Sequence, residues 1–172
     1  MNRWMQAGLA ATLMTMPMAA VSAQDAALMK NFTIADLGNA LDGMNATYVD
    51  ASDSKSINIT FESTLKANGT VMACDDDDRL VNCFGTSILA IFEPAPGTTD
   101  QQVADAINEY NYRENFGRAY RDPSGDISVR IYIIADGGIT RENYRRQIEL
   151  WSQSLEYFTT YLYPQTDKKK GG

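Results

Sequence analysis

Histidine is absent from this sequence, and only two of its 172 residues are cysteines. Catalysis by an activated serine or cysteine depends on a positioned base, which is most often histidine. The Ser-His-Asp and Cys-His arrangements of many hydrolases are therefore excluded. A structural zinc site needs four nitrogen or sulfur ligands, and two cysteines without histidine cannot complete that set.

Phosphate-binding loops and basic clusters are also scarce. Gly137-Gly138 follows a strand-like segment, but no GxGxxG pattern and no Walker lysine accompany it. The formal net charge of −7 argues against a nucleic-acid partner, because phosphate binding uses clustered lysine and arginine. The basic run Lys168-Lys169-Lys170 follows Pro164, so residues 166–172 are predicted to form a flexible tail.

The first 23 residues have the pattern of a cleavable signal peptide. Arg3 supplies the positive start, residues 7–20 are mostly small and apolar, and Val21-Ser22-Ala23 fits a small-residue cleavage site. The apolar run is shorter than the ~20 residues that a membrane span needs. We therefore expect cleavage after Ala23, no membrane span in the mature chain, and a periplasmic or secreted location.

Export would place Cys74 and Cys83 in an oxidising compartment, where a cysteine pair is usually a disulfide. The predicted ring encloses four consecutive carboxylates, Asp75, Asp76, Asp77 and Asp78. These four are a weak candidate for a cation site, because calcium loops place oxygen ligands at alternating positions around a sharp glycine turn. A solvated loop tip is the favoured interpretation of the acidic run, and no cofactor is predicted.

The C-terminal half has the clearest pattern. Residues 122–126, Asp-Pro-Ser-Gly-Asp, are typical of a turn between two paired strands. In the second strand Ile127, Val129, Ile131 and Ile133 alternate with polar residues, which predicts one buried face. Thr140 is suited to cap a following helix. The apolar stripe of that helix consists of Tyr144, Ile148, Trp151, Leu155, Phe158 and Leu162.

Earlier segments indicate two further helices and several strands. Thr33 and Thr99 each stand where a capping residue would open a helix. Residues 46–50 and the alternating segment from Ile57 predict strands, and Asn68-Gly69 predicts a hairpin turn with a return strand over residues 70–74. The continuous apolar run at the end of residues 83–92 predicts a central strand covered on both faces.

Together these segments predict one α+β domain over residues 24–165, in the order α, several β, α, β, β, α. The strands should form an antiparallel sheet with the helices packed on one face. The predicted core contains residues from every part of the chain, namely Leu37, Ile59, Phe61, Ile131, Ile133, Trp151 and Leu155.

Four groups of residues carry a resemblance to a known family: Ile107-Asn108 with Asn111, residues 116–120 (Phe-Gly-Arg-Ala-Tyr), residues 137–140 (Gly-Gly-Ile-Thr), and Trp151. In these the chain resembles the YbjN family, bacterial domains described as regulators of sensory transduction with a fold like that of type III secretion chaperones. The resemblance extends from about Thr33 to Phe158 and implies a small non-catalytic α+β domain. The acidic segment between the cysteines is longer than the family pattern.

Two classes of function follow from these observations. The first is an exported, non-enzymatic, protein-binding or chaperone-like domain of the bacterial envelope, with another polypeptide as its partner and a homodimer as one arrangement. Tyr132, Tyr157 and Tyr161 are its candidate interface, because aromatic side chains off the apolar faces suit protein contacts. Equally, these rings could cover sheet edges within one molecule. The second class is a carboxylate-dependent hydrolase of the periplasm, for which the sequence indicates no particular carboxylate pair.

Overall fold

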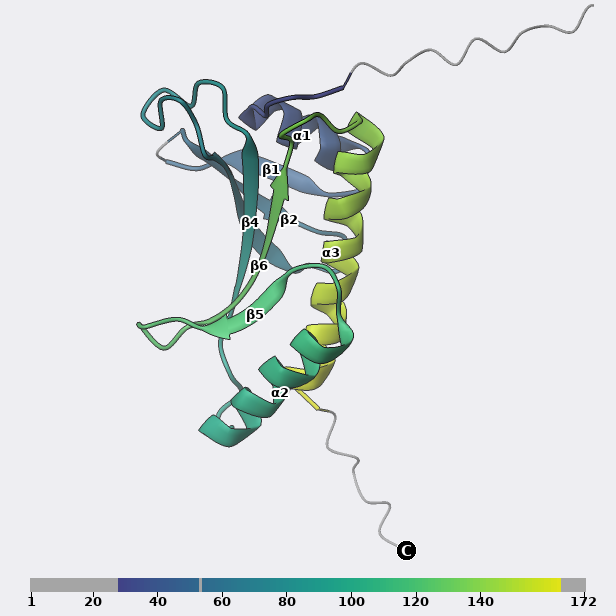
Figure 1. Cartoon of the computed structure of the whole chain (residues 1–172). Helices are drawn as coiled ribbons and strands as arrows, with labels where there is room; N and C mark the ends of the chain where they lie inside the picture. Colours follow the sequence, from purple (N-terminus) through teal and green to yellow (C-terminus); the bar gives the residue numbers. More distant parts are fainter. Residues whose placement is uncertain (1–27, 53, 165–172) are drawn as a thin grey trace, which may run out of the picture.

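Six antiparallel strands form one sheet, and the helices lie on one of its faces (Figure 1). The computed structural model describes residues 28–52 and 54–164; the predicted signal peptide and basic tail lie outside these residues. Along the chain the elements are α1 (Ile34–Asp42), β1 (Thr47–Asp50), β2 (Ser56–Thr60), β3 (Lys66–Met72), β4 (Gly85–Phe92), α2 (Asp100–Arg113), β5 (Arg118–Arg121), β6 (Ile127–Ile134) and α3 (Arg141–Leu162). The strand order is β1-β2-β3-β4-β6-β5, which confirms the predicted α+β class.

Threonine caps open all three of these helices. The Thr33 hydroxyl accepts a hydrogen bond from the Asp36 amide, and the Asp36 carboxylate accepts one in return from the Thr33 amide, at 3.1 Å each. Thr99 and Gln102 form the same reciprocal pair at the start of α2. These contacts satisfy amide groups that have no partner inside the helix.

The core lies between α3 and the sheet. All seven predicted core residues are buried, and Trp151 is completely enclosed. Its ring meets Phe61 edge to face at a centroid distance of 6.1 Å. Close approach of the indole requires Gly117, whose φ is +95° and where an added Cβ would lie 2.8 Å from Trp151 and from the Arg130 carbonyl oxygen.

The predicted hairpin turn at Asn68-Gly69 is wrong. The turn lies at residues 61–65, where Phe61 and Leu65 are hydrogen-bonded and Thr64 has a φ of +67°. Gly69 lies inside β3, under α1, and an added Cβ there would meet Leu37 Cδ2 at 2.7 Å. Packing of α1 on the sheet therefore explains this glycine, which local turn chemistry does not.

The prediction that β4 is covered on both faces is also wrong. The strand is central, since it pairs with β3 on one side and β6 on the other. Thr86, Ile88 and Ala90 are fully buried beneath the helices, whereas Ile91 keeps 57% of its surface exposed. The described helices all pack on the same side of the sheet, so the other side of this apolar strand is exposed to solvent.

The β5–β6 hairpin turns at residues 122–126 as predicted, and Ile127, Val129, Ile131 and Ile133 are buried. Strand β5 is a sheet edge whose outer side is bound by α2. The Asn111 amide donates to the Ala119 carbonyl and accepts from the Ala119 amide, both at 2.9 Å. In the described part of the chain, no helix is long and apolar enough to cross a membrane.

Candidate functional site

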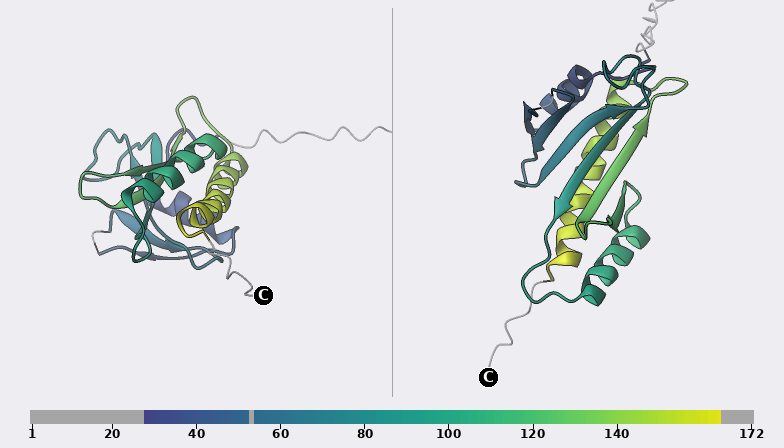
Figure 2. Two further views of the ribbon diagram at one scale, coloured as in Figure 1. Left: turned by 90° about the horizontal axis from the view of Figure 1, so that it is seen from below. Right: turned by 90° about the vertical axis from the view of Figure 1, so that its left-hand side faces the viewer.

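One face of the sheet carries none of the helices that the structure describes, and we call it the open face (Figure 2, right). Strand register assigns its side chains, because directly paired residues point the same way. The open face consists of Thr47, Val49, Ser56, Asn58, Thr60, Lys66, Asn68, Thr70, Met72, Ser87, Leu89, Ile91, Arg118, Tyr120, Ser128, Arg130, Tyr132 and Ile134. None of these residues is acidic and three are basic, although the chain as a whole has a net charge of −7.

Large apolar side chains are exposed on this face. Val49, Ile91, Tyr132 and Ile134 are exposed by 65%, 57%, 40% and 51% respectively. Single exposed apolar residues are ordinary on protein surfaces, but a group on one uncovered sheet face is typical of an interaction site. A shallow hollow of about 500 Å³ lies at the β1–β4 end, and its lining includes Val49, Leu89 and Ile91.

Two arginines and two tyrosines form a cluster at the β5–β6 end of the open face. Arg118 and Arg130 are directly paired across the strands. Each guanidinium lies over both rings, with Cζ-to-centroid distances of 5.3 to 5.8 Å to Tyr120 and Tyr132. These cation–π contacts hold the arginine side chains in place.

Hydrogen bonding within this cluster affects Tyr132. Arg130 Nη1 donates to the Tyr132 hydroxyl at 2.6 Å, and this hydrogen bond lowers the pKa of Tyr132, with a further contribution from Arg118. Among the described residues, no carboxylate lies within ion-pair distance of either arginine. The buried Nε of Arg130 likewise has no hydrogen-bond acceptor among them.

The structure does not bring the three predicted interface tyrosines together. Tyr132 is on the open face, whereas Tyr157 and Tyr161 lie on α3, which covers the opposite face. Tyr157 is 55% exposed. The Tyr161 hydroxyl donates to a Glu114 carboxylate oxygen at 3.1 Å, so this ring links α3 to the end of α2 within one molecule.

Sequence reasoning missed the arginine pair and Ile91 as surface features. The predicted turn at residues 122–126 already implies the pairing of Arg118 with Arg130, because the strands run back from it in register. The sequence alone was therefore sufficient to predict that these two arginines face each other. Ile91 could not be recognised, since its apolar neighbours indicate a strand buried on both sides.

A second hollow, of about 810 Å³, lies between α2 and the end of α3. Its lining includes the carboxylates of Asp105 and Glu109. Asp105 accepts a hydrogen bond from Gln101 at 2.8 Å, and Glu109 pairs with Arg113. Both carboxylates are thus engaged by neighbours on their own helix, and the geometry gives no support to a hydrolase at this place.

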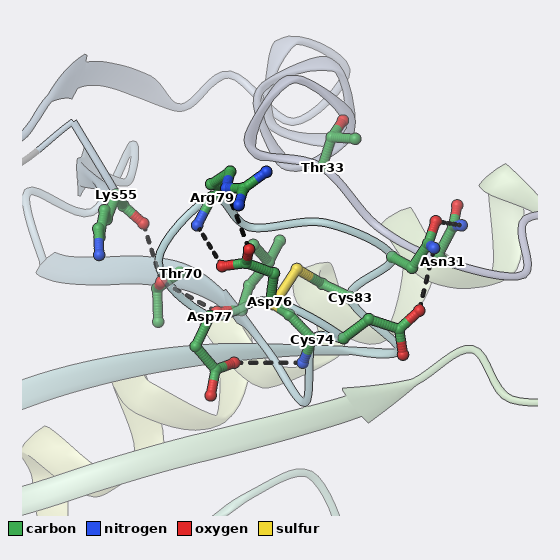
Figure 3. The surroundings of a disulfide bond; sticks show 12 residues. Asn31, Thr33, Lys55, Thr70, Cys74, Asp76, Asp77, Arg79 and Cys83 are labelled. Carbon is green, nitrogen blue, oxygen red and sulfur yellow. Dashed lines mark hydrogen bonds and ion pairs between the residues drawn. A yellow bond between two sulfur atoms is a disulfide. The ribbon is translucent and has the colours of Figure 1, made fainter.

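The acidic loop is organised by its own carboxylates (Figure 3). Asp76 Oδ1 accepts from the amides of Asp78 and Arg79 at 3.0 Å each, and Asp77 Oδ1 accepts from the Cys74 amide at 3.3 Å. Asp75 is bound by Asn82. Within the part of the chain that the structure describes, no group of three acidic or cysteine side chains could hold a metal ion.

The two cysteines lie at the base of this loop. The Cys74 and Cys83 sulfur atoms are 2.05 Å apart and form a disulfide in the structure, as the yellow bond in Figure 3 shows. Cys83 is fully buried, and its carbonyl oxygen accepts from the Phe32 amide at 2.7 Å. This hydrogen bond connects the base of the loop to the segment that leads into α1.

The chain is similar to known proteins in sequence and in fold. The family model YbjN, described as "Putative bacterial sensory transduction regulator", matches residues 70–163. The crystal structure of YbjN from E. coli, a "putative transcription regulator", is 14% identical, with a TM-score of 0.58 over 79% of this chain and 92% of that one. A HopA1–SchA chaperone–effector complex is 15% identical, with a TM-score of 0.44 over 76% and 97% of the two chains. No curated protein matches the sequence.

Proposed function

Because this chain belongs to the YbjN family, we propose that it is an exported, non-enzymatic domain that binds another polypeptide through the open face of its sheet. The observation that carries the proposal is the exposure of Val49, Ile91 and Ile134 on one face that no helix covers. Burying such a face against a partner removes apolar surface from water. Each Å² of apolar surface buried contributes roughly 25 cal/mol of favourable free energy.

The two hollows and the acidic loop support no catalytic alternative. A general acid or base must be positioned at a reacting group, and here the carboxylates are bound by backbone amides, by side-chain amides or by basic neighbours. The open face offers arginine, tyrosine and aliphatic side chains, which are common in protein interfaces. Binding is therefore the activity that this geometry supports best.

Site-specific photo-crosslinking in living cells tests the surface. A photoreactive residue at Ile91 should form an adduct with a polypeptide, because Ile91 is an exposed apolar residue on the open face of the central strand β4. The same residue at Tyr112, which is 84% exposed on α2, serves as the matched control. Equal adducts at both positions, or none at Ile91, would contradict binding through the open face.

Export belongs to the same proposal and has its own test. The signal-peptide pattern of residues 1–23 supports a periplasmic or secreted location. Intact-mass measurement of the protein from a periplasmic fraction should give a chain that begins at Gln24. A chain that retains Met1 and stays in the cytosolic fraction would refute export and leave the binding surface to be judged separately.

A second copy of the chain is one partner to examine. Light scattering of the purified protein, over a tenfold range of concentration, reports whether it associates with itself. If an Ile91→Ser variant abolishes a dimer, the open face is the homodimer interface. If the protein is monomeric at every concentration, the crosslinked polypeptide must be another protein.

A further inference from the structure

The arginine pair stands out because like charges that face each other across two strands destabilise a sheet. Arg118 and Arg130 are in that position, and no open-face residue is acidic. Tyr120 and Tyr132 hold the two guanidinium groups from either side. In a chain with a net charge of −7, this arrangement forms a local positive site with no carboxylate within ion-pair distance among the described residues.

An apolar surface lies directly beside this site. Leu89 is paired with Arg130 across the β4–β6 ladder, and Ile91 is two positions further along β4. Neighbouring strands are ~4.8 Å apart, so the apolar side chains and the arginine pair are separated by ~5–10 Å. Alternate residues of an extended peptide project to one side at a spacing of ~7 Å, which matches this separation.

We propose that the open face binds an extended segment of another polypeptide in which a carboxylate lies two residues from a large aliphatic side chain. The carboxylate meets Arg118 and Arg130, and the aliphatic side chain packs on Leu89 and Ile91. This inference rests on the proposed function, since it specifies the partner of the same surface.

Charge decides in favour of a carboxylate on a polypeptide. Arginine binds planar carboxylates through two parallel hydrogen bonds, and neither Arg118 nor Arg130 has a carboxylate partner among the described residues. Nucleic acid or an anionic membrane would meet few cations here, because Lys66 is the only other basic residue on the open face. The overall negative charge of the chain would also repel a polyanion.

The test uses a labelled probe peptide, Gly-Ser-Ile-Thr-Glu-Thr-Ile-Thr-Glu-Gly-Ser, with the protein purified in the form that the cell produces. Fluorescence anisotropy should show binding that weakens about tenfold or more when both glutamates are replaced by glutamine, because charged hydrogen bonds are about twice as strong as neutral ones. Replacing both isoleucines by serine should also weaken binding.

Protein variants identify which arginines recognise the glutamates of the peptide. The double variant Arg118→Gln and Arg130→Gln should bind the glutamate and glutamine peptides equally. Arg146→Gln on α3 removes one positive charge away from the open face and should retain the full preference. Circular dichroism of each variant shows that it is folded, so that lost binding is not lost structure.

The outcomes separate this inference from the broader one. If the protein shows no preference for the glutamate peptide, the carboxylate proposal is overturned, whereas an adduct at Ile91 still supports polypeptide binding. Tighter binding to phosphatidylglycerol vesicles or to a single-stranded oligonucleotide than to the glutamate peptide would also overturn it. An equal loss in the Arg146→Gln variant would show that only net charge matters.

Discussion

The two faces of the sheet are formed by the same strands, but the described helices cover one face and leave the other exposed to solvent. On β6, Ile133 is 1% exposed beneath the helices, and its neighbour Ile134 is 51% exposed on the open face. Both side chains are isoleucine, so composition does not distinguish the faces. The difference arises from where the helices pack, which indicates that the covered face carries stability and the open face is available for binding.

The strongest test of this contrast is Trp151→Ala. Removing the indole leaves a cavity between α3 and the sheet and should lower the free energy of unfolding by about 3–5 kcal/mol. Urea denaturation followed by circular dichroism measures it. Tyr157→Ala, on the exposed side of the same helix, should change stability by less than about 1 kcal/mol. A comparable loss in both variants would mean that α3 packs differently.

A closer comparison uses adjacent isoleucines. Ile133→Ala should cost about 2–5 kcal/mol, and Ile134→Ala should cost less than about 1 kcal/mol, because only the first removes buried methyl groups. The same urea experiment applies. In the crosslinking assay the order should be reversed among folded variants, with Ile134→Ala weakening partner capture.

High pH provides a third test of the covered face. Burial raises the pKa of Tyr110 to about 12, and its hydroxyl donates to the Phe116 carbonyl at 2.8 Å. The unfolded chain releases this proton near pH 10. The contribution of the raised pKa is therefore fully present below pH 10 and is lost as the pH rises towards 12, by about 2–3 kcal/mol.

Stability measured between pH 9 and pH 12 should thus fall less steeply in Tyr110→Phe than in the unchanged protein. Tyr144 contributes in the same direction, since burial also raises its pKa, so the slope will not vanish. An unchanged slope in Tyr110→Phe would contradict the burial of this hydroxyl group.

The smallest effect is expected on the open face. Arg130→Gln should change the free energy of unfolding by less than about 0.5 kcal/mol, because the loss of its exposed contacts with Tyr120 and Tyr132 is offset by removal of the like charge that faces Arg118. It should raise the pKa of Tyr132, since the hydrogen bond that lowers this pKa is weakened. Spectrophotometric titration at 295 nm, with Tyr132→Phe to assign the transition, measures this change.

The sequence allowed much of the covered face to be predicted. Capping residues such as Thr33 and the alternation of β6 act locally, so their structural consequences can be read from neighbouring residues. The hairpin at Asn68-Gly69 could not be judged in this way. Gly69 is required by the packing of Leu37 from a distant helix, and this tertiary contact outweighs turn preference.

The candidate site depends more on tertiary structure than the core does. A tyrosine on a strand and tyrosines on a helix have the same local appearance, and only the assembled sheet separates Tyr132 from Tyr157 and Tyr161. The exposed side of β4 reflects a conflict between two expectations. Packing of all helices on one face predicts an exposed side, whereas the continuous apolar run favours burial on both sides. Pairing across β5 and β6 was the one part of the site within reach of the sequence.

Asn111 affects how copies of this sheet could assemble edge to edge. Its amide occupies the outward-facing backbone groups of Ala119, so the β5 edge offers little to an incoming strand. At the opposite edge all four residues of β1 are exposed. Two copies could pair through their β1 edges. The resulting dimer would present only its two β5 edges, where Asn111 already binds the Ala119 backbone. Edge-to-edge polymerisation would therefore end at a pair.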